Sequence, residues 1–171
     1  HSTLEDFFKI KIDGVSNDHY EFELNVILQS LFKQKWEESK DNLEELGIGE
    51  QKLSFFYEES ISMLNNWFEN FMKKLLIRSK KSTLKKSFEE LKPETEIYFK
   101  SVDYMLQGYI DAIHNIDGEI SIIDYKTSRR SNITKEYELQ LAIYALFYEE
   151  KYGVLPKYVG IDFLNDKIKY L

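Results

Sequence analysis

The segment Met105–Ser128 contains two aspartates and a lysine whose types and spacing are suited to chemistry on a phosphate group. Asp117-Gly118 separates two runs of β-prone residues, which is a strong signal for a two-residue hairpin turn. With this turn, Asp111 of the first strand lies directly opposite Asp124 of the second, with about 4.5–5.5 Å between their Cβ atoms. Because side chains alternate along a strand, Lys126 shares the face of Asp124. We therefore expect two carboxylates and one ammonium group on one face of a hairpin.

This arrangement predicts a site for a divalent cation. Two facing carboxylates repel each other, so a hairpin that keeps both is expected to hold a cation between them. Mg²⁺ prefers hard oxygen ligands and keeps water in its shell. Such an ion can lower the pKa of a bound water and neutralise charge on a phosphoryl group, while a lysine can orient the water or stabilise the transition state. The alternative is a surface hairpin with a cross-strand salt bridge, because Asp-x-Lys alone is very common.

Three short motifs resemble those of the PD-(D/E)XK nuclease superfamily, and more narrowly those of its RecB-type branch. Gly108-Tyr109-Ile110-Asp111 resembles the G-x-x-D strand, and Asp124-Tyr125-Lys126 resembles the (D/E)-x-K strand. Gln140-Leu141-Ala142-Ile143-Tyr144 follows them and resembles the Q-x-x-x-Y helix of that branch. The order and spacing of all three motifs agree with the family pattern.

The resemblance implies a divalent-metal-dependent DNA nuclease that hydrolyses phosphodiester bonds. By resemblance, Asp111 and Asp124 would be catalytic metal ligands, Lys126 the catalytic lysine, and the backbone carbonyl of Tyr125 a further metal ligand. Glu96 lies where RecB-type proteins often have a glutamate, so it would be an accessory metal ligand. An exposed strand carboxylate is the alternative interpretation of Glu96.

Two pairs of residues are candidates for contacting DNA. Gln140 and Tyr144 are four residues apart and share one face of a predicted helix, although a core face is the alternative. Arg129 and Arg130 directly follow the predicted Asp-Tyr-Lys strand. A further basic segment, residues 71–92, holds eight Lys or Arg against two Glu, and both a solvated helix face and phosphate contact remain open for it.

One expected motif of the RecB-type branch is missing. Relatives carry a G-x-x-x-H element on an early helix, and its His helps to bind the metal. By pattern, Asn25 and Gln29 occupy the Gly and His positions here, while His19 precedes the helix. This gap leaves an alternative function open, namely a catalytically inactive nuclease-like domain that binds nucleic acid or a partner protein. The complete set of Asp111, Asp124 and Lys126 favours activity.

The chain contains no cysteine, so its own residues cannot form a disulfide, a zinc–thiolate site or a cysteine-bound cluster. Several RecB-type nucleases hold an iron–sulfur cluster with four cysteines, and this chain cannot do so. The expected cofactor is therefore Mg²⁺ or Mn²⁺, without an iron–sulfur cluster.

The length of 171 residues, with 43% hydrophobic and 15% aromatic content, predicts one packed globular domain. Helical patterns dominate residues 1–92, and strand patterns with one helix follow over residues 93–171. The fold class we expect is α/β, with a restriction-endonuclease-like mixed central sheet flanked by helices and a helical N-terminal half. In the first half we expect helices over Tyr20–Ser39 and Leu53–Arg78 with a loop over Leu43–Gln51. In the second half we expect strands over 94–104, 106–114 and 119–127, a helix over 134–152 that Thr134 caps and Gly153 ends, and a final hairpin of Lys157–Phe163 and Lys167–Leu171.

The remaining expectations concern the setting of the protein. A net charge of −7 argues against a nonspecific polyanion binder. No run of 18 or more apolar residues is present, so we expect no membrane partner and a cytoplasmic location. The resemblance implies DNA as substrate, exonuclease rather than endonuclease action, a role in DNA repair, recombination or defence, and a helicase or another repair or defence protein as partner. The chain starts at His1, which indicates either a tag remnant or a fragment of a larger protein.

Overall fold

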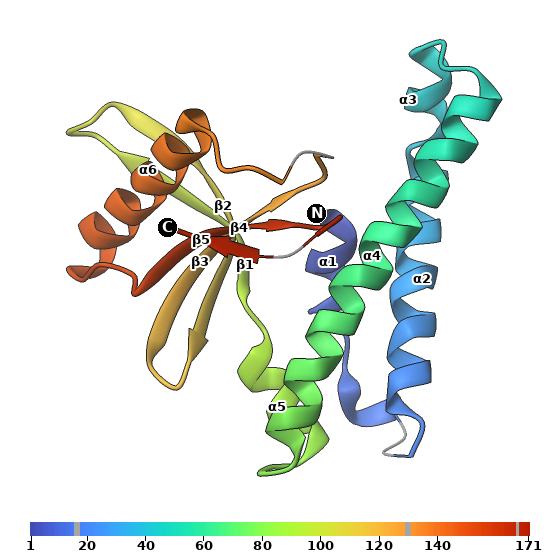
Figure 1. Cartoon of the computed structure of the whole chain (residues 1–171), viewed down its shortest axis with the longest axis horizontal. Coiled ribbons are helices and arrows are strands. Elements are labelled where there is room, and N and C mark those ends of the chain that lie inside the picture. Colours follow the sequence, from blue (N-terminus) through green and yellow to red (C-terminus); the bar gives the residue numbers. More distant parts are fainter. Residues whose placement is uncertain (16–17, 129–130, 167) are drawn as a thin grey trace. The chain divides into compact units, whose positions relative to one another are not determined.

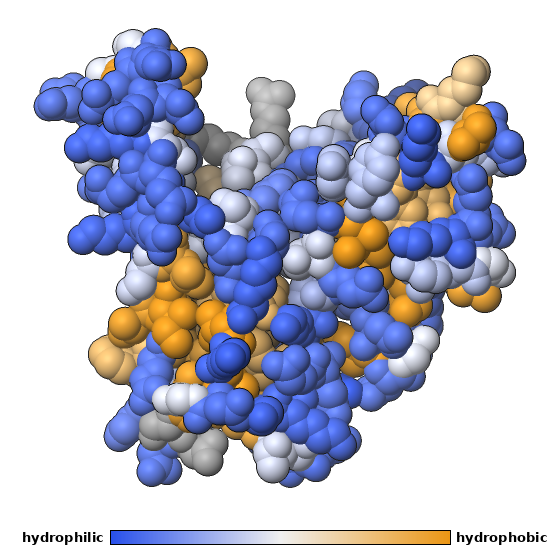
Figure 2. Space-filling view, turned by 180° about the vertical axis from the view of Figure 1, so that it is seen from behind, coloured by the Kyte–Doolittle hydropathy of each residue, from blue (hydrophilic) through white to orange (hydrophobic). Residues whose placement is uncertain are grey.

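The computed structural model describes residues 1–15, 18–128, 131–166 and 168–171. The chain divides into two compact units, residues 1–88 and residues 89–171, and each is described by itself. The first unit is helical and the second contains the sheet (Figure 1). Most of the face drawn in Figure 2 is hydrophilic, with hydrophobic side chains gathered in a few patches. None of the described helices is both long and apolar enough to cross a membrane.

The helical unit is built around a cluster of aromatic side chains. The ring of Phe7 is fully buried, and its centroid lies 5.5 Å from that of Trp67 and 5.6 Å from that of Phe71, with both pairs edge to face. Such edge-to-face pairs add to the stabilisation from burial alone. The elements of this unit are α1 (Ser2–Phe7), a 3₁₀ turn (Ile12–Gly14), α2 (Tyr20–Glu38), α3 (Lys40–Glu45), α4 (Glu50–Ser79) and the first residues of α5 (Leu84–Leu91).

The loop predicted over Leu43–Gln51 is wrong at both ends. Helix α3 continues through Glu45, and α4 already begins at Glu50. Glutamate is a good helix former, so the helix continues until Gly47 interrupts it with a φ of +64°. Gly47 and Gly49 therefore mark the position of the connection correctly, but the connection is shorter than the predicted loop.

The second unit contains a five-stranded mixed sheet in the order β1-β2-β3-β4-β5. Strands β3 and β4 are parallel and all other neighbours are antiparallel. A parallel pair needs a long crossover connection, and α6 supplies it (Figure 1). The prediction of an α/β fold with a mixed sheet and a helical N-terminal half is confirmed. The elements are β1 (Glu94–Ser101), β2 (Leu106–Ile116), β3 (Glu119–Lys126), α6 (Lys135–Tyr152), β4 (Tyr158–Phe163) and β5 (Ile168–Tyr170).

Local sequence signals set several boundaries in this unit. Asp117 and Gly118 have φ values of +57° and +85°, as a type I′ hairpin turn requires. The side chain of Thr134 accepts a hydrogen bond from the backbone N–H of Tyr137 and so caps α6 as predicted. Gly153 ends α6 in a left-handed conformation, also as predicted. Strand β1 was predicted to reach residue 104 but ends at Ser101.

Helix α6 packs on one face of the sheet and closes a hydrophobic core over it. The rings of Phe99 on β1 and Phe147 on α6 stack with centroids 5.9 Å apart. Leu141 on the same helix is fully buried. This packing fixes the helix against the strands that carry the predicted site. The other buried members of the core are Ile110, Ile113, Ile122, Tyr144, Tyr148, Ile161 and Phe163.

The junction of β4 and β5 gives a direct test of this sheet. A Cβ added to Gly160 would lie 2.7 Å from the backbone oxygen of Lys169, so the two strands would have to separate. We expect Gly160→Ala to destabilise the protein by about 1–3 kcal/mol, which urea unfolding followed by circular dichroism measures. Gly14→Ala is the matched control, because a Cβ there meets no atom within 4 Å. Equal midpoints for both variants would contradict the described pairing.

Candidate active site

The β2–β3 hairpin brings Asp111 and Asp124 together. Its regular pairs run from Ile116 with Glu119 to Ala112 with Ile123, which is the predicted register and ends one position before Asp111 and Asp124. The carboxylate of Asp111 accepts a hydrogen bond of 2.9 Å from the backbone N–H of Tyr125. Asp111 thus binds the backbone of β3 beside Asp124, and its charge contributes to raising the pKa of Asp124.

Helix α6 holds the carboxylate of Asp124 from the other side. The Asp124 side chain is almost fully buried, with 1% of its surface exposed. Gln140 donates a hydrogen bond of 3.0 Å from Nε2 to Oδ1 of Asp124. The hydroxyl of Tyr144 lies 3.4 Å from the same oxygen and 2.7 Å from Nε2 of Gln140. The two residues of the helical motif therefore form one small network with the aspartate of the strand motif.

The second oxygen of Asp124 faces Lys126. Nζ of Lys126 lies 2.6 Å from Oδ2, so the predicted common face of these two residues is confirmed as an ion pair. Apart from this ion pair, the buried Oδ2 has no hydrogen-bond partner among the residues that the structure describes. A buried carboxylate oxygen without a hydrogen bond is unfavourable. Oδ2 of Asp124 is therefore a candidate ligand for a cation.

Glu96 on β1 extends the row of carboxylates to a third strand. The β1–β2 register pairs Thr95 with Ala112 and Ile97 with Ile110, which places Glu96 opposite Asp111. A carboxylate oxygen of Glu96 lies within 4.8 Å of one of Asp111. Glu96 has a φ of +51°, an uncommon left-handed value for a residue other than glycine. Such strained positions are typical of functional sites.

Burial dominates the electrostatics of the two hairpin aspartates. It raises the pKa of Asp111, although the hydrogen bond from the Tyr125 backbone acts in the opposite direction. Burial also raises the pKa of Asp124; Lys126 opposes this effect and the charge of Asp111 adds to it. Both shifts have burial as their largest cause, because removal from water disfavours the charged form of a carboxylate. The site therefore attracts positive charge.

These features fit a bound divalent cation. The donors are hard carboxylate oxygens on neighbouring strands, which Mg²⁺ and Mn²⁺ accept as ligands. Asp111 and Asp124 would hold the ion, with Glu96 as an accessory ligand. Oδ2 of Asp124 becomes available to it once Nζ of Lys126 moves aside, because that ammonium group now neutralises the same oxygen.

Other predicted site residues are less well defined by the structure. Arg129 and Arg130, predicted to contact DNA, lie outside the described residues. The backbone carbonyl of Tyr125 stays a predicted metal ligand. Gln140 and Tyr144 were predicted to contact DNA, with a core face as the alternative, and their hydrogen bonds to Asp124 were not predicted. The four-residue spacing showed that both share a helix face, but nothing local to the sequence identified the partner across the core.

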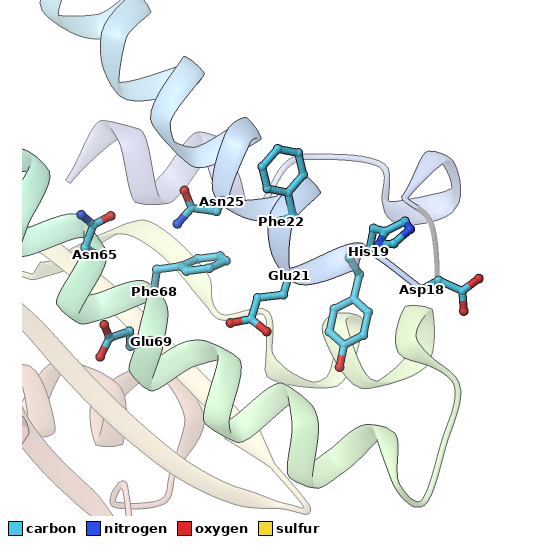
Figure 3. Close-up of a pocket in the computed structure, with 9 residues that line it drawn as sticks. Asp18, His19, Glu21, Phe22, Asn25, Asn65, Phe68 and Glu69 are labelled. Carbon is cyan, nitrogen blue, oxygen red and sulfur yellow. The ribbon is translucent and has the colours of Figure 1, made fainter.

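The missing G-x-x-x-H motif can be followed in the helical unit. Gln29, at the His position, donates a hydrogen bond of 2.8 Å from Nε2 to Oδ1 of Asn65 on α4. Asn25, at the Gly position, lines an open pocket of about 740 Å³ in the same unit (Figure 3). Figure 3 shows Glu21 and Phe68 turned towards this hollow. Gln29 thus interacts with Asn65, and Asn25 lines a surface hollow. Neither residue is identified as the third metal ligand.

Comparison with known proteins agrees with the motifs. The model of the PD-(D/E)XK nuclease superfamily matches residues 1–167. The chain is also 38% identical over 77 residues to the Gene 69 protein of Mycobacterium phage D29, a match that covers 44% of this chain. The chain spans only about a quarter of that relative's length, since the match covers 27% of it.

The chain therefore belongs to the PD-(D/E)XK nuclease superfamily. The superfamily is named for nucleases, which hydrolyse the phosphodiester bonds of nucleic acids. The paired aspartates and the nearby lysine are the part of the fold in which such chemistry is expected.

The raised pKa of Asp111 predicts how its replacement affects stability. The pKa of Asp111 is higher in the folded protein than the value of 3.8 for the unfolded chain. The contribution of Asp111 to the free energy of unfolding therefore falls as the pH rises between these two pKa values. Asp111→Asn removes the charge and keeps an oxygen for the Tyr125 N–H. In EDTA at neutral pH we expect this variant to melt at a higher temperature than the wild type, with the difference shrinking as pH falls towards 3.8.

Differential scanning calorimetry across that pH range measures the effect. The exposed Asp103→Asn serves as the control and is expected to track the wild type. A variant at Asp111 that melts at or below the wild-type temperature at neutral pH would contradict a poorly compensated buried charge.

Proposed function

We propose that this chain is the nuclease domain of a RecB-type DNA exonuclease that uses Mg²⁺ or Mn²⁺. The observation that carries the proposal is the contact between the strand and helix motifs: Gln140 and Tyr144 both approach Oδ1 of Asp124, while Lys126 faces Oδ2. The strand motif and the helix motif thus meet at one carboxylate. A role in DNA repair, recombination or defence, a helicase or similar partner and a cytoplasmic location belong to the same proposal.

In this proposal each residue has a distinct task. Asp111 and Asp124 would hold the metal, which when bound would neutralise charge at the phosphate and make a water more acidic. Lys126 moves off Asp124 and orients the attacking water or stabilises the charge that develops on the phosphoryl oxygens. Gln140 keeps the Asp124 carboxylate in position through Oδ1, which leaves Oδ2 for the metal.

The second candidate is an inactive nuclease-like domain that binds DNA or a protein. The observation in its favour is Gln29, which stands where relatives have a metal-binding His and is engaged with Asn65. The burial of Asp111 and Asp124, which raises the pKa of both, supports the active form, because a site that had lost its metal would gain stability by losing these carboxylates.

Cleavage of DNA by point variants tests the proposal directly. We expect Asp124→Ala and Lys126→Ala each to lower divalent-dependent cleavage of labelled linear DNA by at least about a hundredfold, as removal of a residue that stabilises the transition state does elsewhere. Lys157→Ala is the matched lysine control, because Lys157 pairs with Glu119 at the opposite end of β3. Comparison of linear with circular DNA separates exonuclease from endonuclease action.

Cleavage by either site variant at the wild-type rate would refute the assignment. If EDTA left the wild-type activity intact, the metal dependence would be wrong. If the folded wild type bound Mn²⁺ but cut no DNA, the inactive domain would be the better description.

The helix network predicts a separate effect on the metal. We expect Gln140→Ala to weaken the binding of Mn²⁺ about 10- to 100-fold, because groups that orient a ligating carboxylate tune metal affinity by that amount. Isothermal titration calorimetry on the DNA-free protein measures this change. Glu138→Ala, an exposed change two residues earlier on α6, is expected to leave the affinity unaltered. Unchanged affinity in the Gln140 variant would mean that the helix does not position Asp124.

A further inference from the structure

The ammonium group of Lys126 has a second neighbour besides Asp124, namely the aromatic ring of Tyr137 in the first turn of α6. Nζ of Lys126 lies 5.4 Å from the centre of this ring, within the range of a cation–π interaction. The side chain of Lys126 is only 22% exposed, so the contact is partly removed from water. One lysine is therefore shared by a carboxylate and an aromatic ring.

The fold holds this ring over the end of β3. Lys126 is paired with Phe163 of β4, whose side chain lies in the core beneath α6. The ring centroids of Tyr137 and Phe163 are 6.2 Å apart. The backbone N–H of Tyr137 donates a hydrogen bond of 3.4 Å to Oγ1 of Thr134, which restrains the residue at the start of the helix. Tyr137 therefore covers the neighbouring side chains of Phe163 and Lys126 together.

The position of Lys126 during the reaction needs a restraint of this kind. A lysine side chain is a flexible stem that carries a point charge, so its orientation depends on the groups around it. In the proposed function Lys126 leaves Oδ2 of Asp124, and the ion pair then no longer holds the ammonium group. The ring of Tyr137 attracts the same ammonium group without being a carboxylate ligand for the metal.

We propose that Tyr137 is a positioning residue for Lys126, whose ammonium group its ring retains at the active site after that group leaves Asp124. This inference rests on the proposed nuclease function and adds a residue that lies outside the three motifs. A cation–π contact that is partly removed from water contributes about a five- to thirtyfold change in an equilibrium or a rate. In this role Tyr137 acts through Lys126 and does not itself touch the phosphate.

The other end of β3 offers a matched control contact. Nζ of Lys157 pairs with Glu119 and lies 5.3 Å from the ring centre of Tyr158, so a lysine is again shared by a carboxylate and a tyrosine. Glu119 is the first residue of β3 and Lys126 is the last, which separates the two contacts by roughly 20–25 Å. Removal of the Tyr158 ring therefore repeats the chemical change away from the candidate active site.

The kinetic test compares Tyr137→Leu, which removes the ring, with Tyr137→Phe, which retains it. We expect Tyr137→Leu to lower kcat for divalent-dependent DNA cleavage about five- to thirtyfold with KM unchanged, because Lys126 acts in the transition state. We expect Tyr137→Phe and the control Tyr158→Leu to cleave at the wild-type rate. Thermal melting followed by circular dichroism verifies that each variant is folded.

Fluorinated phenylalanines in place of Tyr137 separate the electrostatics of the ring from its packing. Each added fluorine withdraws negative charge from the face of the ring and weakens its attraction for a cation, while the shape of the side chain changes little. We expect kcat to fall stepwise from phenylalanine through its monofluoro, difluoro and trifluoro forms. A ring that only packs would give the same kcat in all of them.

Nuclear magnetic resonance detects the contact without metal or DNA. The face of an aromatic ring shifts nearby protons upfield, and the Cε protons of Lys126 adjoin the ammonium group over Tyr137. In EDTA we expect these protons to be shifted upfield in the wild type and in Tyr137→Phe, and to lose this shift in Tyr137→Leu. Lys126→Ala identifies the signal by its disappearance. We expect the upfield shift to persist at saturating Mg²⁺.

The inference is overturned if Tyr137→Leu cleaves at the wild-type rate, if all the fluorinated forms are equally active, or if the Lys126 signal in Mg²⁺ is independent of the ring. An equal loss of activity in Tyr158→Leu would also overturn it. Cleavage by the wild type is measured separately. Its absence on every DNA would refute the proposed function, whereas the metal-free signal of Lys126 would still report whether the contact with Tyr137 exists.

Discussion

Two carboxylates held on facing strands inside a protein need positive charge between them, and this requirement organises the sheet unit. Asp124 is buried beneath α6, and burial raises the pKa of both Asp124 and Asp111. Lys126 supplies the only charge that the structure pairs with Oδ2 of Asp124 within the described residues, at 2.6 Å. A lysine in that position offsets part of the negative charge of the site.

The surrounding fold is what keeps these charges together. The type I′ turn fixes the register of β2 and β3, and the hydrogen bond from the Tyr125 N–H fixes the Asp111 carboxylate. The hydrophobic contact of Leu141 and Phe147 with the sheet holds α6 in place, which lets Gln140 reach Asp124. Burial of the two carboxylates is unfavourable by itself, and the hydrophobic core between α6 and the sheet offsets this cost. Functional sites commonly reduce stability and are supported by the packing around them.

The parts that could be predicted from the sequence are those controlled by local chemistry. Asp117-Gly118 permits left-handed backbone at both turn positions, so one dipeptide predicted the register that runs from Ile116 with Glu119 to Ala112 with Ile123. The network of Gln140 with Asp124 depends on how α6 packs over the sheet, and no local pattern carries that information. The same limit applies to Glu96, whose left-handed backbone and proximity to Asp111 follow from a third strand.

The central claim is that Asp111 and Asp124 share one divalent cation. The most direct measurement is anomalous X-ray diffraction from crystals of the protein soaked in Mn²⁺. The account predicts an anomalous peak bound by carboxylate oxygens of both aspartates, with Nζ of Lys126 displaced from Oδ2 of Asp124. A peak bound elsewhere at saturating Mn²⁺, with the Lys126–Asp124 pair unchanged, would contradict it.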